Sequence, residues 1–202
     1  DIDIARIMAD AMGVRLVPKV LPFAELIPAY QVRQSQLDLS DAIQQMFADQ
    51  AILVAEAGTG IGKDAARKLL ERGHRVIATT HSEAEVASLQ EQLGAGATVF
   101  KLDITAAEDR AKVADLDVDV LINKAALGES GSLAEIDINR IRTLFEVNLF
   151  SSLELTQIAI RGMIKRCGGT VIFISSIAGR IPTAFMMPYG MTKFAVSAAA
   201  AG

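Results

Sequence analysis

Short apolar segments that alternate with amphipathic stretches run through the chain from residue 51 onward. Amphipathic stretches occupy 63–72, 83–93, 106–115 and 137–166. Between them, Val- and Ile-rich segments typical of strands buried on both faces lie at 51–55, 75–80, 97–102, 119–123 and 170–175. This alternation predicts an α/β fold, a Rossmann-like parallel sheet with helices on both faces. We expect five strands in the order 3-2-1-4-5, with a ligand crevice at their carboxyl ends.

The first fifty residues have a different character. They contain helical patterns at 4–12 and 37–47, are interrupted by Pro18, Pro22 and Pro28, and offer no group of residues suited to chemistry. We therefore predict a mostly helical extension over residues 1–50 and a Rossmann-type domain over residues 51–202. The chain begins with Asp1 and stops inside a predicted helix, so either end is expected to be a cut end.

Charge and composition narrow the possible partners. The net charge is -4 and no block of Lys and Arg is present, which disfavours nucleic acid and anionic membrane surfaces. We found no basic leader and no unbroken apolar run long enough to span a bilayer. The single cysteine, Cys167, excludes an internal disulfide, and with two histidines it is too little for a soft-ligand metal cluster. A reducing, cytoplasmic location is expected.

A glycine-rich loop directly follows the first predicted strand and leads into a helix. It contains Gly58, Thr59, Gly60, Ile61 and Gly62. Glycines at this point let backbone N–H groups approach a pyrophosphate at the positive end of the helix dipole. The loop is therefore predicted to bind the phosphates of a dinucleotide, although a tight strand-to-helix turn needs glycine in any case.

The same loop also resembles a nucleoside-triphosphate P-loop, from Ala57 to Lys63. In that pattern the next residue is Ser or Thr, whose hydroxyl holds magnesium, but here it is Asp64. ATP hydrolysis is therefore disfavoured.

Four further motifs lie downstream in a fixed order. They are Asn123-Lys124-Ala125-Ala126 after the fourth strand, Asn148 in the long amphipathic stretch, Ser175-Ser176 after the fifth strand, and Tyr189 to Lys193 opening the next helix. Together with the glycine loop, this order and spacing resemble the short-chain dehydrogenase/reductase family over about 150 residues.

The resemblance implies a nicotinamide-dependent oxidoreductase that interconverts a small-molecule alcohol and a carbonyl. Tyr189 would be the acid/base, and Lys193, four residues later on the same helix face, would favour the tyrosinate and grip the nicotinamide ribose. Ser176 would hydrogen-bond the reacting oxygen. Asn148 would help to hold a water that connects Lys193 to solvent.

The family pattern also supplies cofactor contacts outside the glycine loop. It implies that Asp103 touches the adenine and that Asn123 and Ala125 line the crevice, together with Tyr189 and Lys193. The second strand ends in Thr80 and His81 rather than in an Asp or Glu that would accept from the ribose hydroxyls of NAD. NADP is therefore favoured over NAD.

Four residues depart from the family pattern, and the first of them is Ala55, where the Thr before the loop is expected. Glu56 stands where the first loop glycine is expected, and its bulk and charge should weaken pyrophosphate binding unless its side chain swings away. Lys124 and Ala126 replace the second Asn and the Gly of Asn-Asn-Ala-Gly. Family members also continue beyond the Tyr-x-x-x-Lys helix, which implies that this chain is truncated.

The N-terminal part resembles other proteins. Residues 1–31 look like part of a periplasmic amino-acid-binding protein, and residues 32–63 look like the start of a DinG-type helicase up to its P-loop. These likenesses raise a second hypothesis, that the chain is a mosaic or designed protein that binds or neutralises a protein partner without catalysis.

The resemblance to the short-chain dehydrogenase/reductase family also allows a homo-oligomer, formed through residues 137–166.

Overall fold

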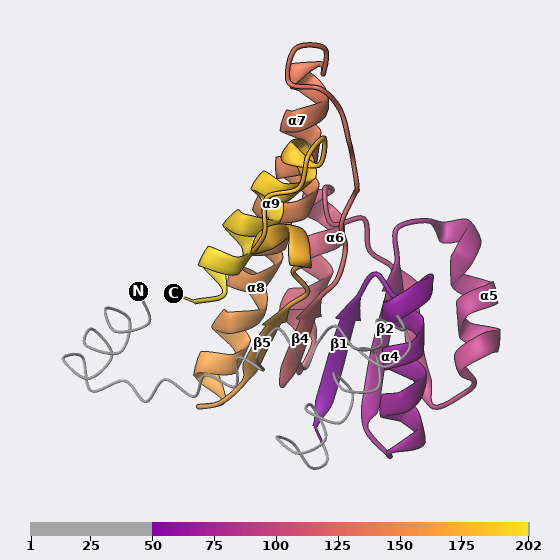
Figure 1. The fold of residues 1–202 in the computed structure, drawn as a ribbon. Helices are drawn as coiled ribbons and strands as arrows, with labels where there is room; N and C mark the ends of the chain where they lie inside the picture. Colours follow the sequence, from indigo (N-terminus) through magenta and orange to yellow (C-terminus); the bar gives the residue numbers. More distant parts are fainter. Residues whose placement is uncertain (1–49, 202) are drawn as a thin grey trace, which may run out of the picture. The chain divides into compact units, whose positions relative to one another are not determined.

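The computed structural model describes residues 50–201 (Figure 1). The helical extension predicted for residues 1–50 therefore lies almost wholly outside the described residues. The periplasmic-protein likeness of residues 1–31 lies outside them as well, and so does most of the helicase-like segment.

The centre of the described domain is a five-stranded parallel sheet with the order β3-β2-β1-β4-β5, as predicted. Every strand pairs in parallel, with Leu53 of the central strand opposite Ile77 on one side and Leu121 on the other. The strands are β1 (Ala51–Ala55), β2 (Arg75–Thr80), β3 (Ala97–Lys101), β4 (Val120–Asn123) and β5 (Thr170–Phe173). All of them start within one residue of their predicted position, and β3 and β5 end one and two residues early.

Alternate residues of β1 build the two faces of the core. Ile52 and Val54 pack in one apolar cluster with Leu69 and Leu89, from the helices that follow β1 and β2. Leu53 and Ala55 face the other cluster, which includes Leu155 and Met163 from the long helix before β5. All these side chains are at most 5% exposed. Burial on both faces explains why the strands are continuous apolar runs.

Helices cover both faces of the sheet (Figure 1). The helices are α4 (Gly60–Glu71), α5 (Glu83–Leu93), α6 (Ala107–Ala111), α7 (Ile138–Phe145), α8 (Ser151–Lys165) and α9 (Met187–Ala199). Short 3-10 helices lie at Lys112–Asp115 and Ile177–Gly179.

Two helix predictions need correction. The stretch 137–166 is not one regular helix, because a π-helical turn at Glu146–Phe150 separates α7 from α8. The stretch 106–115 is likewise divided into α6 and a 3-10 turn. Neither break has a proline or glycine inside it, so apolar periodicity alone could not reveal it.

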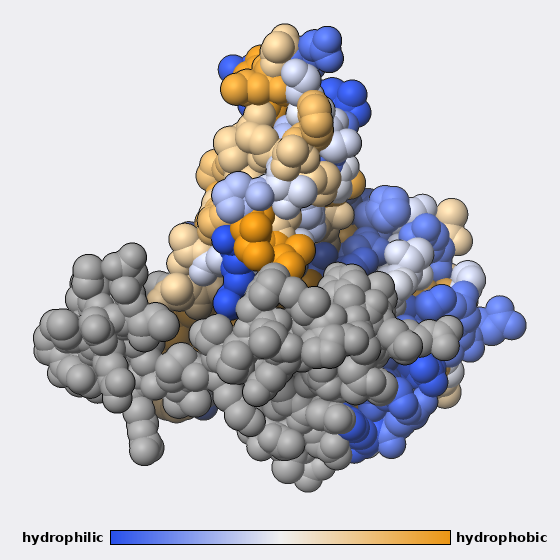
Figure 2. Space-filling view, viewed as in Figure 1, coloured by the Kyte–Doolittle hydropathy of each residue, from blue (hydrophilic) through white to orange (hydrophobic). Residues whose placement is uncertain are grey.

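Apolar side chains gather around α7 and the loops beside it, at the upper end of Figure 2. Leu133 is 77% exposed, Phe185 69% and Ile138 55%. The loop before α7 and the loop before α9 are joined there, since the Gly131 N–H donates to the Phe185 carbonyl over 2.8 Å. Within residues 50–201, no helix has the length and apolar character needed to cross a membrane.

Candidate functional site

The glycine loop lies at the carboxyl end of β1 and forms the start of α4. Thr59 is the extended residue before the helix, Gly60 has a φ of 55°, and Ile61 belongs to the first turn. A Cβ on Gly62 would lie 2.3 Å from the Glu56 carbonyl oxygen, a clash with backbone. Only glycine fits there, so the helix start can press against the strand end and present its N–H groups to the crevice.

Glu56 does not swing away from this loop. Its backbone has a φ of 68°, a left-handed conformation that favours glycine. Its N–H donates to the Thr79 hydroxyl over 3.1 Å, and its carboxylate accepts from the Gly58 N–H over 3.3 Å. The side chain thus occupies one of the donors that an incoming phosphate would use.

A hollow of about 320 Å³ opens beside the loop at the carboxyl ends of the strands. Four predicted cofactor residues line it, namely Thr59, His81, Asp103 and Ala125. The departures Glu56, Lys124 and Ala126 line it as well.

The predicted cofactor residues Thr80 and Asn123 are buried and, like Gly62 and Lys193, do not line this hollow. The Asn123 amide donates to the Thr156 hydroxyl of α8 over 2.9 Å. The side-chain oxygen Oδ1 of Asn123 is buried without a hydrogen-bond partner. Asn123 therefore ties β4 to α8.

Asp103 is held in a defined orientation at the edge of the hollow. Its carboxylate accepts from both the hydroxyl and the N–H of Thr105, over 2.7 and 2.9 Å. The hydroxyl bond is the main reason that the pKa of Asp103 lies below its ordinary value. The Asp103 N–H in turn donates to the buried carboxylate of Asp109 over 2.9 Å.

Lys193 lies at the centre of a second group of candidate site residues, which is built around α9. Its side chain is buried, and its Nζ donates to the Ile174 carbonyl over 2.9 Å, just beyond β5. The same Nζ lies 5.6 Å from the centre of the Tyr189 ring. Burial, and secondarily the ammonium of Lys124, lower the pKa of Lys193 to about 8.

The loop after β5 holds Ser176 against the helix that carries Tyr189. Ser176 caps the 3-10 turn, and its hydroxyl accepts from the Ala178 N–H over 3.2 Å. Its neighbour Ser175 donates to the Lys193 carbonyl over 3.1 Å. A Cβ on Gly179 would lie 2.5 Å from that same carbonyl oxygen. Close backbone contact therefore fixes the serine loop on α9.

Asn148 lies in the π-helical turn and is buried. Its Oδ1 accepts from the Leu127 N–H over 2.7 Å, and its Nδ2 donates to the Leu127 carbonyl and to the Thr192 hydroxyl, each over 2.9 Å. The side chain therefore joins the loop after β4 to the residue before Lys193, rather than bonding to Lys193 itself. π-helical turns recur at functional sites because they disturb the regular backbone bonding.

Glu85 is a charged residue beside the crevice that the sequence patterns did not single out. Its carboxylate accepts a hydrogen bond from the Thr80 hydroxyl and lies 3.8 Å from Nδ1 of His81. The sequence could have pointed to Glu85, because it is a carboxylate four residues after His81 in the first turn of the next helix.

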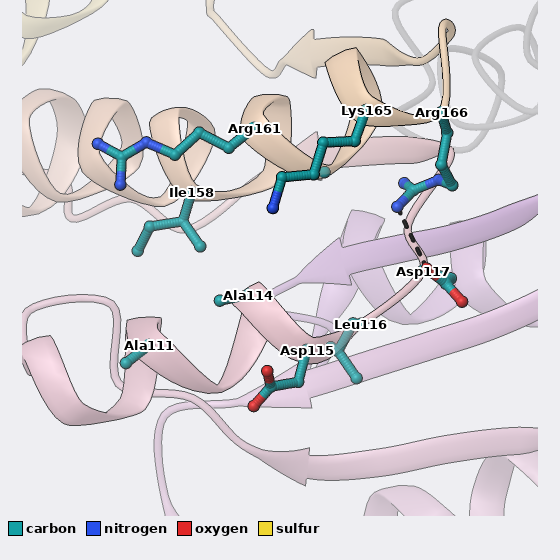
Figure 3. A pocket seen from close by; sticks show the side chains of 10 residues that line it. Ala111, Ala114, Asp115, Leu116, Asp117, Ile158, Arg161, Lys165 and Arg166 are labelled. Atoms are coloured by element: carbon teal, nitrogen blue, oxygen red, sulfur yellow. Dashed lines mark hydrogen bonds and ion pairs between the residues drawn. The ribbon is translucent and has the colours of Figure 1, made fainter.

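Two other hollows lie outside the predicted cofactor contacts. One of about 390 Å³ is apolar and lies on α9 beside the serine loop, lined by Met186, Met187, Met191 and Phe194 among others. The other, of about 540 Å³, lies between α8 and the 3-10 turn before β4, at the amino ends of the strands. Figure 3 shows it with Arg161 and Lys165 along one wall. None of the predicted site residues lines either hollow.

Comparisons with known proteins agree with this architecture. The family model of the short chain dehydrogenases matches residues 50–201. An uncharacterised short-chain type dehydrogenase/reductase of Sinorhizobium fredii is 34% identical over 149 residues, which is 73% of this chain and 60% of that protein. An NADP-dependent 3-hydroxy acid dehydrogenase of Salmonella typhi is 31% identical over 152 residues, covering 70% of this chain and 60% of that enzyme. The chain thus spans about 60% of the length of these curated relatives.

Two solved structures show the same fold with a bound cofactor. The closed form of serine dehydrogenase complexed with NADP+ superposes with a TM-score of 0.68 and 28% identity, covering 72% of this chain and 62% of that one. A variant of actinorhodin polyketide ketoreductase with NADPH gives a TM-score of 0.71 and 27% identity, covering 74% and 62%.

The family match also takes in residues 50–63, so the glycine loop belongs to the dehydrogenase-like region, whereas the start of a DinG-type helicase was expected over residues 32–63. The sheet order, the loop and the family match lead to one conclusion. Over residues 50–201, the chain belongs to the short-chain dehydrogenase family.

Proposed function

We propose that the protein is an NAD(P)-dependent oxidoreductase that interconverts an alcohol and a carbonyl compound, with Tyr189 as the acid/base. One observation carries the proposal: the buried Nζ of Lys193 is fixed on the Ile174 carbonyl and lies 5.6 Å from the Tyr189 ring. Burying an ammonium is costly unless it is paired or hydrogen-bonded, and here the Ile174 carbonyl accepts from it. The Tyr189 hydroxyl, on the same turn of α9, would transfer the proton beside this ammonium.

The dinucleotide would lie in the crevice beside the glycine loop. Gly62 allows the start of α4 to pack against the Glu56 backbone, and the hollow of about 320 Å³ lies at the carboxyl ends of the strands, where parallel sheets bind nucleotides. The loop residues Gly58 to Gly62 would hold the pyrophosphate, and Asp103 would accept from the adenine. Lys124, which also lines the hollow, supplies a positive charge for the phosphates.

When bound, the nicotinamide would donate or accept the hydride. The protein's part is to manage the proton and the reacting oxygen. In the reducing direction the Tyr189 hydroxyl gives its proton to the carbonyl oxygen as the hydride arrives at carbon, and in the oxidising direction it takes the proton back. The Ser176 hydroxyl would donate to the same oxygen and stabilise its developing charge.

The substrate would have an apolar part next to its alcohol or carbonyl. The methionine-lined hollow of about 390 Å³ adjoins the helix turn that carries Tyr189. Methionine side chains adapt to irregular apolar shapes, so this surface suits a range of small carbonyl compounds.

The direct test is nicotinamide-dependent turnover by the purified 202-residue chain. Aliphatic and aromatic ketones and aldehydes would be offered with NADH or NADPH, and loss of the reduced-nicotinamide absorbance would be followed. Turnover of any of them that is absent from a Tyr189→Phe preparation supports the proposal. A chain that binds neither dinucleotide contradicts it.

Glu56 favours a second candidate, a non-catalytic protein that binds a protein partner. Its carboxylate already satisfies the Gly58 N–H, as an internal group would in a loop that no longer receives a phosphate. In that case the chain would be a mosaic in which the dehydrogenase fold serves as a scaffold. Tyr189→Phe would then leave partner binding intact, whereas deletion of residues 1–50 would abolish it.

A further inference from the structure

Two carboxylates and a histidine converge at the end of β2. Glu56 Oε2 lies 3.5 Å from Nδ1 of His81, and Glu85 Oε2 lies 3.8 Å from the same nitrogen. Glu85 is fixed there because it accepts from the Thr80 hydroxyl. The two acids come from different elements, the loop after β1 and the first turn of α5.

The pair lies directly against the glycine loop. A Cβ on Gly58 would be 3.0 Å from Glu56 Oε1 and 3.4 Å from Glu85 Oε2. In folds of this kind the adenosine ribose lies between the glycine loop and the end of the second strand. Both carboxylates therefore border the place where the 2′ substituent of the adenosine ribose would lie.

In the described part of the chain, few basic side chains lie near the expected position of the ribose 2′ substituent, and they are not oriented toward it. His81 is the nearest, and its side chain is 69% exposed. Lys63, in the first turn of α4, has its Nζ on Gln92 Oε1 of α5 over 3.0 Å. Lys124 lines the hollow from the end of β4. Among residues 50–201, a 2′-phosphate would meet two carboxylates and no guanidinium, whereas a free 2′-hydroxyl could donate to either acid.

We propose that Glu85, assisted by Glu56, makes this chain select NAD(H) over NADP(H). The inference rests on the proposed dinucleotide function and reverses the preference that the residues at the end of β2 suggest. It also differs from the cofactor named for the Salmonella 3-hydroxy acid dehydrogenase. In this chain the carboxylate that accepts from the ribose would come from α5 rather than from the strand end.

The test is calorimetric titration of the 202-residue chain with NADH and with NADPH. The parent should bind NADH at least roughly tenfold more tightly, because a phosphate dianion beside two carboxylates is repelled. Glu85→Gln keeps the shape and the bond to Thr80 but removes a charge, so the ratio of the two dissociation constants should fall toward one. Glu83→Gln, an exposed acid in the same helical turn, is the matched control and should leave the ratio unchanged.

His81→Arg provides the reciprocal test. A guanidinium at this position would pair with the 2′-phosphate and neutralise the acids, so NADPH should become the preferred ligand. Equal or tighter binding of NADPH by the parent overturns the selectivity while the oxidoreductase proposal stands. A ratio that neither Glu85→Gln nor Glu56→Gln changes also overturns it. Failure of the parent to bind either dinucleotide overturns both proposals.

Discussion

The ammonium of Lys193 lies 5.6 Å from the centre of the Tyr189 ring while its hydrogen bond goes to the Ile174 carbonyl. One turn of α9 therefore presents a phenol backed by a buried cation, and the end of β5 holds that cation in place. The proposed chemistry depends on this arrangement, and so does the response of the fold to pH.

The low pKa of Lys193 predicts that stability rises in alkaline solution. The pKa is about 8 in the folded chain against an ordinary value of 10.5, so between these pH values the unfolded chain binds more protons. The penalty for burying the charged lysine is thus present below pH 8 and is lost as the pH rises toward 10.5. Its full size would be about 3 kcal/mol.

Urea unfolding of the parent and of Lys193→Met at about pH 7.5 and about pH 10 measures this effect. The difference in unfolding free energy between the two chains should shift in favour of the parent at the higher pH. The same shift in both proteins would assign it to other groups and contradict the burial of a charged Lys193.

Glu56→Gly should strengthen dinucleotide binding. The substitution frees the Gly58 N–H, removes a negative charge from the crevice and relieves the left-handed backbone at a φ of 68°. We expect the dissociation constant for NADH to fall by roughly tenfold. Glu56→Gln removes the charge but keeps the side chain, so it should recover only part of the gain. Weaker NADH binding by Glu56→Gly would mean that the Glu56 carboxylate contributes more at the ribose hydroxyl than it costs at the pyrophosphate.

Asp109→Asn should lower both the free energy of unfolding and the affinity for the dinucleotide, whose adenine would lie beside Asp103. Burial alone would raise the pKa of Asp109, but hydrogen bonds from Lys101, Lys112 and the Asp103 N–H lower it below its ordinary value. Its contribution is therefore present above about pH 4 and is lost as the pH falls below that value. We expect a loss of about 1–3 kcal/mol at about pH 7, measured by urea unfolding.

An exposed acid nearby, Asp115, supplies the control for Asp109. Asp115→Asn should leave both stability and dinucleotide affinity unchanged. Equal effects of the two substitutions would show that net charge, rather than the bond to Asp103, is responsible.

Cys167→Gly should stabilise the chain. Cys167 follows α8 with a φ of 59°, and the next N–H, from Gly168, donates back to the Met163 carbonyl, as in a glycine-terminated helix. Removing the Cβ should raise the unfolding free energy by about 0.5–1 kcal/mol, which thermal melting can detect. Cys167→Ala keeps a Cβ and should show no such gain, so a gain from alanine would argue against backbone strain as the cause.

The sheet could be predicted because each strand is a short apolar run that is recognisable from its own sequence. Buried parallel strands must be apolar on both faces, and the runs at 51–55 and 75–80 coincide with β1 and β2. The break in the long helix at Asn148 was not predictable, because it is stabilised by partners far along the chain, Leu127 and Thr192. Periodicity reports the buried face of a helix but not a single inserted residue.

The site residues divide in the same way. Candidates in continuous motifs, such as Tyr189 and Lys193, could be proposed from the resemblance of the ordered motifs to the family, and the same resemblance marked Glu56 as a departure. The role proposed for Glu85 depends on the packing of α5 against the glycine loop, which the spacing of residues does not encode. Its carboxylate is next to Thr80 and His81 only once the chain has folded.

The most direct test of the central claim is single-turnover hydride transfer by Tyr189→Phe at saturating dinucleotide, with affinity measured on the same samples. The phenylalanine variant keeps the ring near Lys193 but has no proton to give. We predict unchanged dinucleotide affinity and a rate lower by roughly 10²–10⁴-fold. An undiminished rate in Tyr189→Phe would contradict the role of this tyrosine as the acid/base.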